Sequence, residues 1–135
     1  MSGEALAQAA RGLIGTRFLL HGRDPATGLD CIGVLAAALV AIGREPALPN
    51  GYALRTREPA GVDDIARRCG LIAAAPPARA GDVLLARVGG CQFHLLLAVG
   101  GERFVHAHAA MRRVVLHDGQ PDWPILGRWR LPDEF

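Results

Sequence analysis

Residues 82–108 read DVLLARVGGCQFHLLLAVGGERFVHAH, and this stretch decides the fold class. It contains three short apolar runs of β-strand type, separated by Gly89-Gly90 and Gly100-Gly101. Glycine pairs between such runs are typical of hairpins that join antiparallel strands. Two further runs follow, RRVVLH at 112–117 and ILGRWRL at 125–131. This half of the chain therefore predicts an antiparallel sheet of about five to six strands.

The segment LDCIGVLAAALVAIG, residues 29–43, predicts a helix over 31–42. Asp30 is a suitable N-cap, and Gly43 suits the position just after the helix end. Because the segment is apolar nearly all round, we expect a central, buried helix.

Two more helices are expected before the sheet. Residues 3–14 have apolar side chains at helical spacing, and VDDIARRC at 62–69 is a short helix that ends at Gly70. Residues 15–29 and 44–60 are expected to be irregular. Helices first and hairpin-linked strands second indicate an α+β fold, with the helices packed on the sheet. The whole chain, 1–135, is interpreted as a single domain.

Composition narrows the range of partners. Half of the 135 residues are hydrophobic, which suits one domain with a buried core. The formal net charge is +2, and the 15 basic residues, all arginine, are scattered along the chain. A surface that binds nucleic acid usually appears as a basic stripe, so no nucleic-acid partner is expected. Because no apolar stretch reaches the ~20 residues that cross a bilayer, no membrane insertion is expected.

The first residues, MSGEALAQAARGLIG, lack the basic start and apolar block of a secretory signal. We therefore expect synthesis in the cytoplasm without a signal peptide.

Cys31, Cys69 and Cys91 are an odd number of cysteines without a CxxC pair, so a disulfide framework is not expected. A thiol attacks as thiolate, and a helix N-terminus or a nearby imidazolium lowers its pKa from ~8.5. Cys31 opens the central helix, whereas Cys69 lies in the last turn of a helix, where the dipole has the opposite sign. Cys91 has no helix beside it. Cys31 is therefore the candidate nucleophile, and Cys69 is interpreted as a core residue.

A base for Cys31 is expected on the hairpin HLLLAVGGERFVH, which begins with His94 and ends with His106. If Gly100-Gly101 form a two-residue turn, His94 pairs with Ala107 and the two histidines face opposite sides of the sheet. If the loop has three residues, or an equivalent bulge, His94 stands opposite His106 on the same face. Glycine suits both loops, so the spacing leaves both open. In the second arrangement His94 is the base and His106 orients its ring.

A zinc site is the rival interpretation of the same residues. Cys91, His94, His106 and His108 are ligand types that zinc accepts. Residues 91 and 94, however, point to opposite faces of a strand unless Cys91 lies in the loop. We therefore expect no metal and no other cofactor. His117 ends a predicted strand and is expected to be exposed to solvent.

The order RGLIGTRF, GLDCIGVL, ARAGDVLLAR and HLLLAVGGERFVHAH resembles the NlpC family of papain-like cysteine peptidases, which cleave bacterial cell-wall peptides. The resemblance runs from about residue 5 to about residue 131. It implies a papain-like core of helices on an antiparallel sheet. It also implies Cys31 as nucleophile, His94 as base and His106 as third member of the triad.

The chain departs from the common family pattern at two places. Arg17-Phe18 replaces the usual Pro-Tyr, whose hydroxyl reaches the active site, so His21 or a backbone group is expected to substitute. We expect Phe18, His21 and Asp30 to contribute to substrate binding. Ile32 stands after the cysteine, where the family often has Ser. In this the chain resembles a short phage-type subgroup that is encoded among the tail genes of prophages and gene-transfer particles.

The resemblance implies a peptidoglycan endopeptidase that forms an acyl-enzyme and hydrolyses the γ-D-glutamyl-diaminopimelate bond of the stem peptide. The subgroup implies carriage by a phage-like tail, with tail-tip or hub proteins as partners. Two alternatives remain open: a cytoplasmic or injected muropeptide amidase, and a structural tail-hub component with weak or no activity.

Overall fold

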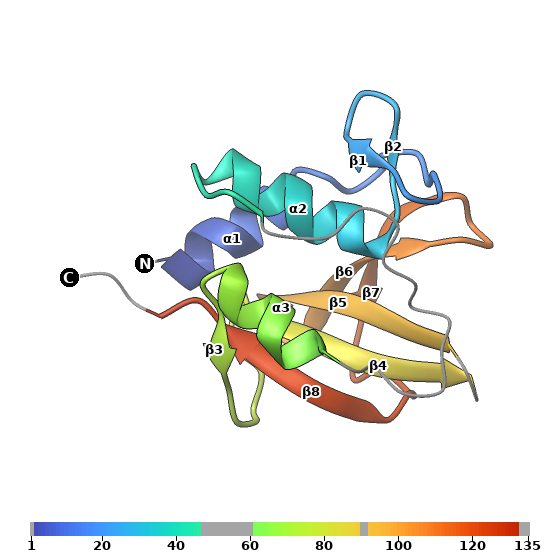
Figure 1. Ribbon diagram of the computed structural model, residues 1–135. Helices are drawn as coiled ribbons and strands as arrows, with labels where there is room; N and C mark the ends of the chain where they lie inside the picture. Colours follow the sequence, from blue (N-terminus) through green and yellow to red (C-terminus); the bar gives the residue numbers. More distant parts are fainter. Residues whose placement is uncertain (1, 47–60, 90–91, 133–135) are drawn as a thin grey trace.

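The computed structural model describes residues 2–46, 61–89 and 92–132. In this part of the chain, two helices cover one face of a six-stranded sheet, and a third lies beside one end of it (Figure 1). The helices are α1 (Ser2–Arg11), α2 (Cys31–Ala41) and α3 (Val62–Arg68). The strands are β1 (Arg23–Asp24), β2 (Gly28–Leu29), β3 (Ile72–Ala73), β4 (Val83–Gly89), β5 (Gln92–Gly100), β6 (Arg103–His108), β7 (Arg113–Asp118) and β8 (Ile125–Arg130).

The sheet has the order β3-β8-β4-β5-β6-β7, and all neighbouring strands run antiparallel. This confirms the predicted α+β class with helices packed on an antiparallel sheet. The five long strands lie where the apolar runs predicted them. Strands β1 and β2 form a separate small hairpin within the segment predicted to be irregular. With two residues each, β1, β2 and β3 are too short to show a period in the sequence.

Helix α2 begins as the sequence predicted. Asp30 has extended backbone angles, and its side chain accepts a 2.8 Å hydrogen bond from the Gly33 N–H. Residues 31–39 are all buried, and Gly43 adopts a φ of +81° just after the helix. Helix α1 is shorter than predicted and ends at Arg11.

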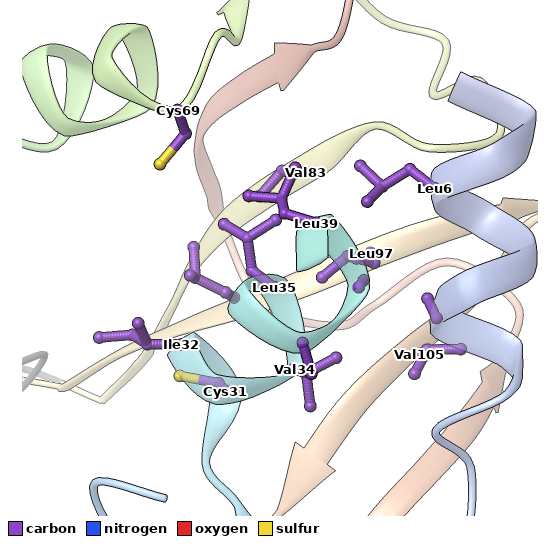
Figure 2. Packing of buried hydrophobic residues seen from close by; sticks show 14 of the residues in the cluster. Leu6, Cys31, Ile32, Val34, Leu35, Leu39, Cys69, Val83, Leu97 and Val105 are labelled. Carbon is purple, nitrogen blue, oxygen red and sulfur yellow. The ribbon is translucent and has the colours of Figure 1, made fainter. Parts of the chain in front are cut away.

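The sheet is packed on both faces. On one face, apolar residues of α1 and α2 pack against side chains of the strands. Leu35 of α2, Leu97 of β5 and Val105 of β6 belong to this cluster (Figure 2). On the other face, a smaller cluster contains Leu96 and Phe104, which alternate with members of the first cluster along their strands. We call these the helix-side cluster and the far-side cluster. Cys31 belongs to the helix-side cluster.

The segment before β1 connects the sheet to the start of α2. The Val114 N–H in β7 donates to the Thr16 carbonyl at 2.8 Å, and the Leu29 N–H in β2 donates to the Arg17 carbonyl at 2.9 Å. The predicted loop 15–29 is thus held to the edge of β7 on one side and to the residues before Cys31 on the other.

The β5–β6 hairpin differs from both predicted loops. Ala98 pairs with Phe104 and Gly100 with Arg103, so the register shifts at the end of β5. The turn residues are Gly101 and Glu102, both with positive φ, and the shift is a β-bulge before them. Like the second predicted arrangement, the bulge places His94 and His106 on the same face of the sheet. Carried along the strands, however, this register sets His106 opposite Leu96 rather than opposite His94.

No helix in the described ranges is long and apolar enough to cross a membrane. Of the predicted features, Cys91 and residues 47–60 of the irregular stretch lie outside the described residues.

Candidate active site

Cys31 occupies the first turn of α2, as predicted, but the residue is buried, with 8% of its surface exposed. The backbone N–H of Leu95 in β5 hydrogen bonds to the sulphur, and so do the N–H groups of Ile32 and Cys31 itself. The sulphur therefore meets β5 at the residue directly after His94. The N–H groups of Leu95 and Ile32 favour an anion at this position.

The position of Cys31 at a helix start predicted a lowered pKa for its thiol, and this prediction is wrong for the resting protein. Burial, the largest effect, raises the pKa of the thiol to about 12, and the negative charge of Asp30 adds to the rise. The backbone hydrogen bonds, including that from Leu95, lower the pKa but do not compensate. The resting group is therefore a neutral thiol.

His94 and His106 form a direct pair. The His94 Nε2 and the His106 Nδ1 lie 2.8 Å apart, and the two rings are perpendicular at 87° with centroids 4.9 Å apart. Burial lowers the pKa of His94 to about 4 and that of His106 to about 3, with smaller contributions from neighbouring histidines. Both rings are therefore neutral near neutral pH.

This hydrogen bond defines what each nitrogen can do. For His94 to act as a base through Nδ1, its proton must reside on Nε2, which then donates to the His106 Nδ1. His106 in turn carries its own proton on Nε2. A second proton arriving at the His94 Nδ1 leaves the bond to His106 intact, so His106 can orient the base in both protonation states.

The two strands that carry the pair separate next to it. Among the described residues, the pairing of β5 with β6 ends at Leu97 and Val105, before His94 and His106 are reached. The Leu95 N–H, in the unpaired stretch, is the one that contacts the Cys31 sulphur. The structure thus brings Cys31 to the backbone beside His94, and it brings His94 to His106. It gives no contact between the Cys31 thiol and the His94 ring, because His94 pairs with Ala86 of the far-side cluster, whereas Cys31 belongs to the helix-side cluster.

Trp123 covers the histidine pair, a role that the sequence analysis missed. Its ring meets His94 edge-on at a centroid distance of 5.9 Å and His106 at 6.0 Å. Trp123 packs against the far-side cluster and helps to exclude water from both imidazoles. The available signal was a large aromatic residue between two prolines in the loop 118–124.

Two further histidines lie on the same face, and the exposure predicted for His117 is wrong. His117 is partly buried, and its ring centroid lies 6.2 Å from that of His106. The ring of His108 lies 5.7 Å from that of His106, and its Nδ1 accepts a hydrogen bond from the Met111 N–H at 3.1 Å.

Asp30 is fully engaged within the protein. One carboxylate oxygen accepts from the Gly33 N–H and from the Arg23 guanidinium at 3.0 Å, and the other accepts from the His21 N–H at 2.9 Å. These bonds hold the preceding loop against the first turn of α2. Asp30 is thus a cap and an anchor for that loop.

Gly33 is required for the same close approach. A Cβ added to Gly33 would lie 2.0 Å from the Gly22 carbonyl oxygen, so only glycine fits two residues after Cys31. Phe18 packs against the helix-side cluster that contains Cys31, whereas the His21 side chain is exposed.

Within residues 2–46, 61–89 and 92–132, no group of three or more His, Cys, Asp or Glu side chains is placed to hold a metal ion. The zinc set considered above includes Cys91, which lies outside these ranges.

No protein-family model matches the sequence, and no curated protein matches it. Solved structures do match. NlpC1 from Trichomonas vaginalis is 21% identical, with a TM-score of 0.70 over 96% of this chain and 44% of NlpC1. The NlpC/p60 domain of the peptidoglycan hydrolase SagA is 25% identical, with a TM-score of 0.62 over 93% of this chain and 99% of the domain. The peptidoglycan hydrolase RipB from Mycobacterium tuberculosis is 18% identical, with a TM-score of 0.58 over 98% of this chain and 66% of RipB.

The chain spans less than half of NlpC1, and 46% of the related NlpC2. At these identities the comparisons concern architecture. The chain has the papain-like fold of NlpC/P60 domains.

Proposed function

We propose that this protein is a cysteine peptidase of the NlpC/P60 type that hydrolyses an amide bond in the stem peptide of peptidoglycan. The observation that carries the proposal is the 2.8 Å His94–His106 hydrogen bond, formed beside the strand residue that contacts the Cys31 sulphur. Nucleophile, base and orienting group are the three parts that acyl transfer through a thiol needs. SagA and RipB, which share the fold, are peptidoglycan hydrolases, and this supports the substrate class.

In this mechanism the thiol and the imidazole are both neutral before reaction. As the Cys31 sulphur attacks the peptide carbonyl, the His94 Nδ1 takes the thiol proton, and His106 stabilises the imidazolium that forms. The high pKa of Cys31 and the low pKa of His94 mean that this transfer accompanies attack rather than precedes it.

The start of α2 supplies the donors for the oxyanion. The N–H groups of Cys31 and Ile32 lie against the sulphur, so they also lie near the carbonyl oxygen of a bound substrate. His94 then protonates the leaving amine, and water hydrolyses the acyl-enzyme. None of these steps requires a cofactor.

We propose the γ-D-glutamyl-diaminopimelate bond as the one cleaved, and delivery by a phage-like tail as the route to the wall. The support for both is the sequence resemblance, including Ile32 after the nucleophile and Arg17-Phe18 in place of Pro-Tyr. Asp30, Phe18 and His21 are proposed to shape the substrate side. For Asp30 this is an indirect role through the loop that it anchors.

Digestion of purified muropeptides and intact sacculi tests the activity. We expect mass spectrometry to identify new γ-D-glutamyl C-termini and diaminopimelate N-termini from both substrates. Cleavage of free muropeptides alone would instead favour the amidase alternative. Absence of any new terminus with folded protein would contradict the proposal.

A second candidate function is a structural tail component with little activity. Two observations favour it: the Cys31 thiol is 8% exposed with a raised pKa, and Phe18 has no hydroxyl to offer a substrate. Iodoacetamide labelling separates the two functions: in the active protein His94 takes the thiol proton as the sulphur attacks the reagent, so Cys31 should react faster than Cys69, which is 4% exposed at the end of α3. Equal labelling rates would favour the structural function.

A further inference from the structure

Two arginines face each other at the edge of the sheet, next to the candidate site. Arg17, in the segment before β1, and Arg113, the first residue of β7, are partners in an isolated antiparallel bridge. One backbone hydrogen bond lies on each side of this bridge. Arg17 and Arg113 therefore form a non-hydrogen-bonded pair, the type in which opposite side chains lie closest.

Nothing in the described part of the chain compensates these two charges. Both residues are exposed, and neither guanidinium has an ion pair or hydrogen bond with a described residue. At the other end of the β6–β7 ladder, by contrast, Arg103 lies opposite Asp118 and forms an ion pair with it. Like charges directly opposite each other destabilise a sheet, so the arginine pair costs stability that a bound anion would offset.

His108 extends the arginine pair toward the histidine pair of the site. It lies opposite Arg113 in the β6–β7 ladder, so its side chain shares a face with both arginines and with His106, two residues earlier. The ring centroids of His108 and His106 are 5.7 Å apart. Because the His108 Nδ1 accepts from the Met111 N–H, the neutral ring carries its proton on Nε2 and offers a further donor.

Arg17 also connects the pair to the candidate nucleophile. Its carbonyl accepts from the Leu29 N–H at 2.9 Å, two residues before Cys31. The arginines are thus held to the start of α2 on one side and reach the histidine pair through His108 on the other. They lie at the border of the site in which a substrate carbonyl would meet Cys31.

Neighbouring guanidiniums favour a carboxylate, because each offers charged donors in a planar fork. The substrate class proposed above carries carboxylates: a γ-linked D-glutamyl residue keeps its α-carboxylate, and diaminopimelate has a second one beyond the cleaved bond. We propose that Arg17 and Arg113, together with His108, bind a carboxylate of the stem peptide and so select acidic peptides over their uncharged analogues. The identity of the ligand rests on the proposed function, whereas an anion site at the arginine pair does not.

Calorimetric titration with soluble stem peptides tests the proposal. The protein carries Cys31→Ala, so that the peptide stays intact. Three peptides are compared: the parent, one with the glutamyl α-carboxylate amidated, and one with lysine in place of diaminopimelate. We expect one of the two changes to weaken binding about tenfold, at the lower end of what a charge-assisted hydrogen bond contributes, and that change identifies the carboxylate.

The double variant Arg17→Gln/Arg113→Gln assigns the effect to the arginines. In the Cys31→Ala background it should bind the parent peptide about tenfold more weakly, and the change that identified the carboxylate should have no further effect. With Cys31 present, the double variant should raise KM about tenfold and leave kcat within about twofold, because this contact is the same in the ground state and the transition state.

A control and a stability measurement exclude a merely structural role. Arg103→Gln, which removes an exposed arginine at the other end of the ladder, should leave KM and kcat unchanged. The melting temperature of Arg17→Gln/Arg113→Gln should equal or exceed that of the wild type, because a repulsive pair has been removed.

The proposal is overturned if the parent peptide does not bind, if all three peptides bind equally, or if the double variant weakens all three alike. Weaker binding of the double variant to intact sacculi, with unchanged binding of the soluble peptide, would also overturn it, because the arginines would then bind a wall polymer. If the protein hydrolyses no peptide but the arginine-dependent binding is found, the carboxylate site stands and the proposed function fails.

Discussion

Acidification from about pH 7 to about pH 5 should destabilise this protein through His94 and His106. Burial lowers their pKa values to about 4 and about 3, whereas a histidine in the unfolded chain titrates near ~6.5. In this pH range the two histidines therefore bind protons in the unfolded chain but not in the folded protein. The stability that depends on these groups is fully present above pH ~6.5 and falls as the pH drops toward the folded pKa values.

At about pH 5 each of the two histidines costs at most about 2 kcal/mol, so the pair costs at most about 4 kcal/mol. Domains of this size typically have an unfolding free energy of about 5–15 kcal/mol, so the loss is a large share of it. The assay is urea unfolding of the wild type and of the double variant His94→Gln/His106→Gln across this pH range. The wild type should lose up to about 4 kcal/mol more unfolding free energy than the variant does.

His21→Gln, which removes an exposed histidine, is the control and should follow the wild type. If the wild type and the double variant lose the same free energy between the two pH values, the two imidazoles are not held neutral by burial. The neutral resting state of the histidine pair would then be wrong.

Three further changes test the framework around the site. Asp82→Asn breaks a buried ion pair in which both carboxylate oxygens meet the Arg130 guanidinium at 2.8 Å, and should cost about 3 kcal/mol of unfolding free energy in urea. Gly33→Ala would place a methyl group 2.0 Å from a carbonyl oxygen of the preceding loop, so both stability and hydrolysis should fall in thermal unfolding and kinetic assays. Trp123→Leu opens the histidine pair to water, so the acid limb of kcat/KM should move from about pH 4 toward ~6.5 as the pKa of His94 rises.

Matched variants show which result would contradict each expectation. Asp64→Asn removes an exposed ion pair within α3 and should cost under about 0.5 kcal/mol, so a cost equal to that of Asp82→Asn would contradict the buried pair. Gly43→Ala meets no atom within 4 Å and suffers only from its positive φ, so it should leave hydrolysis unchanged. An acid limb that stays in place in Trp123→Leu would show that this ring does not control the base.

Much of the scaffold of the site could be predicted from local sequence. The Asp30 cap, the apolar helix behind Cys31 and the long strands all have strong short-range signals, and the structure has them where they were expected. Gly33 is required for a packing reason, the approach of the Gly22 carbonyl. Such a contact between distant segments leaves no local pattern.

The parts that depend on tertiary geometry could not be predicted. Two loop lengths were considered for the hairpin, and the protein instead has a bulge next to Gly100. The bulge puts the two histidines on the same face, but not directly opposite each other. The pKa of Cys31 was expected to fall because of its helix position, but burial, which sequence does not display, dominates. Trp123 and His117 join the site only because a loop and an edge strand fold back onto one face.

The central claim is that Cys31 is the nucleophile, and the most direct measurement compares Cys31→Ala with Cys69→Ala. Both replace a buried cysteine, and only the first removes the thiol that contacts the Leu95 backbone. The rate of release of new amine termini from purified stem peptide should fall by at least ~10⁴-fold in Cys31→Ala and remain near the wild-type rate in Cys69→Ala. Retained hydrolysis in a folded Cys31→Ala protein would contradict the account.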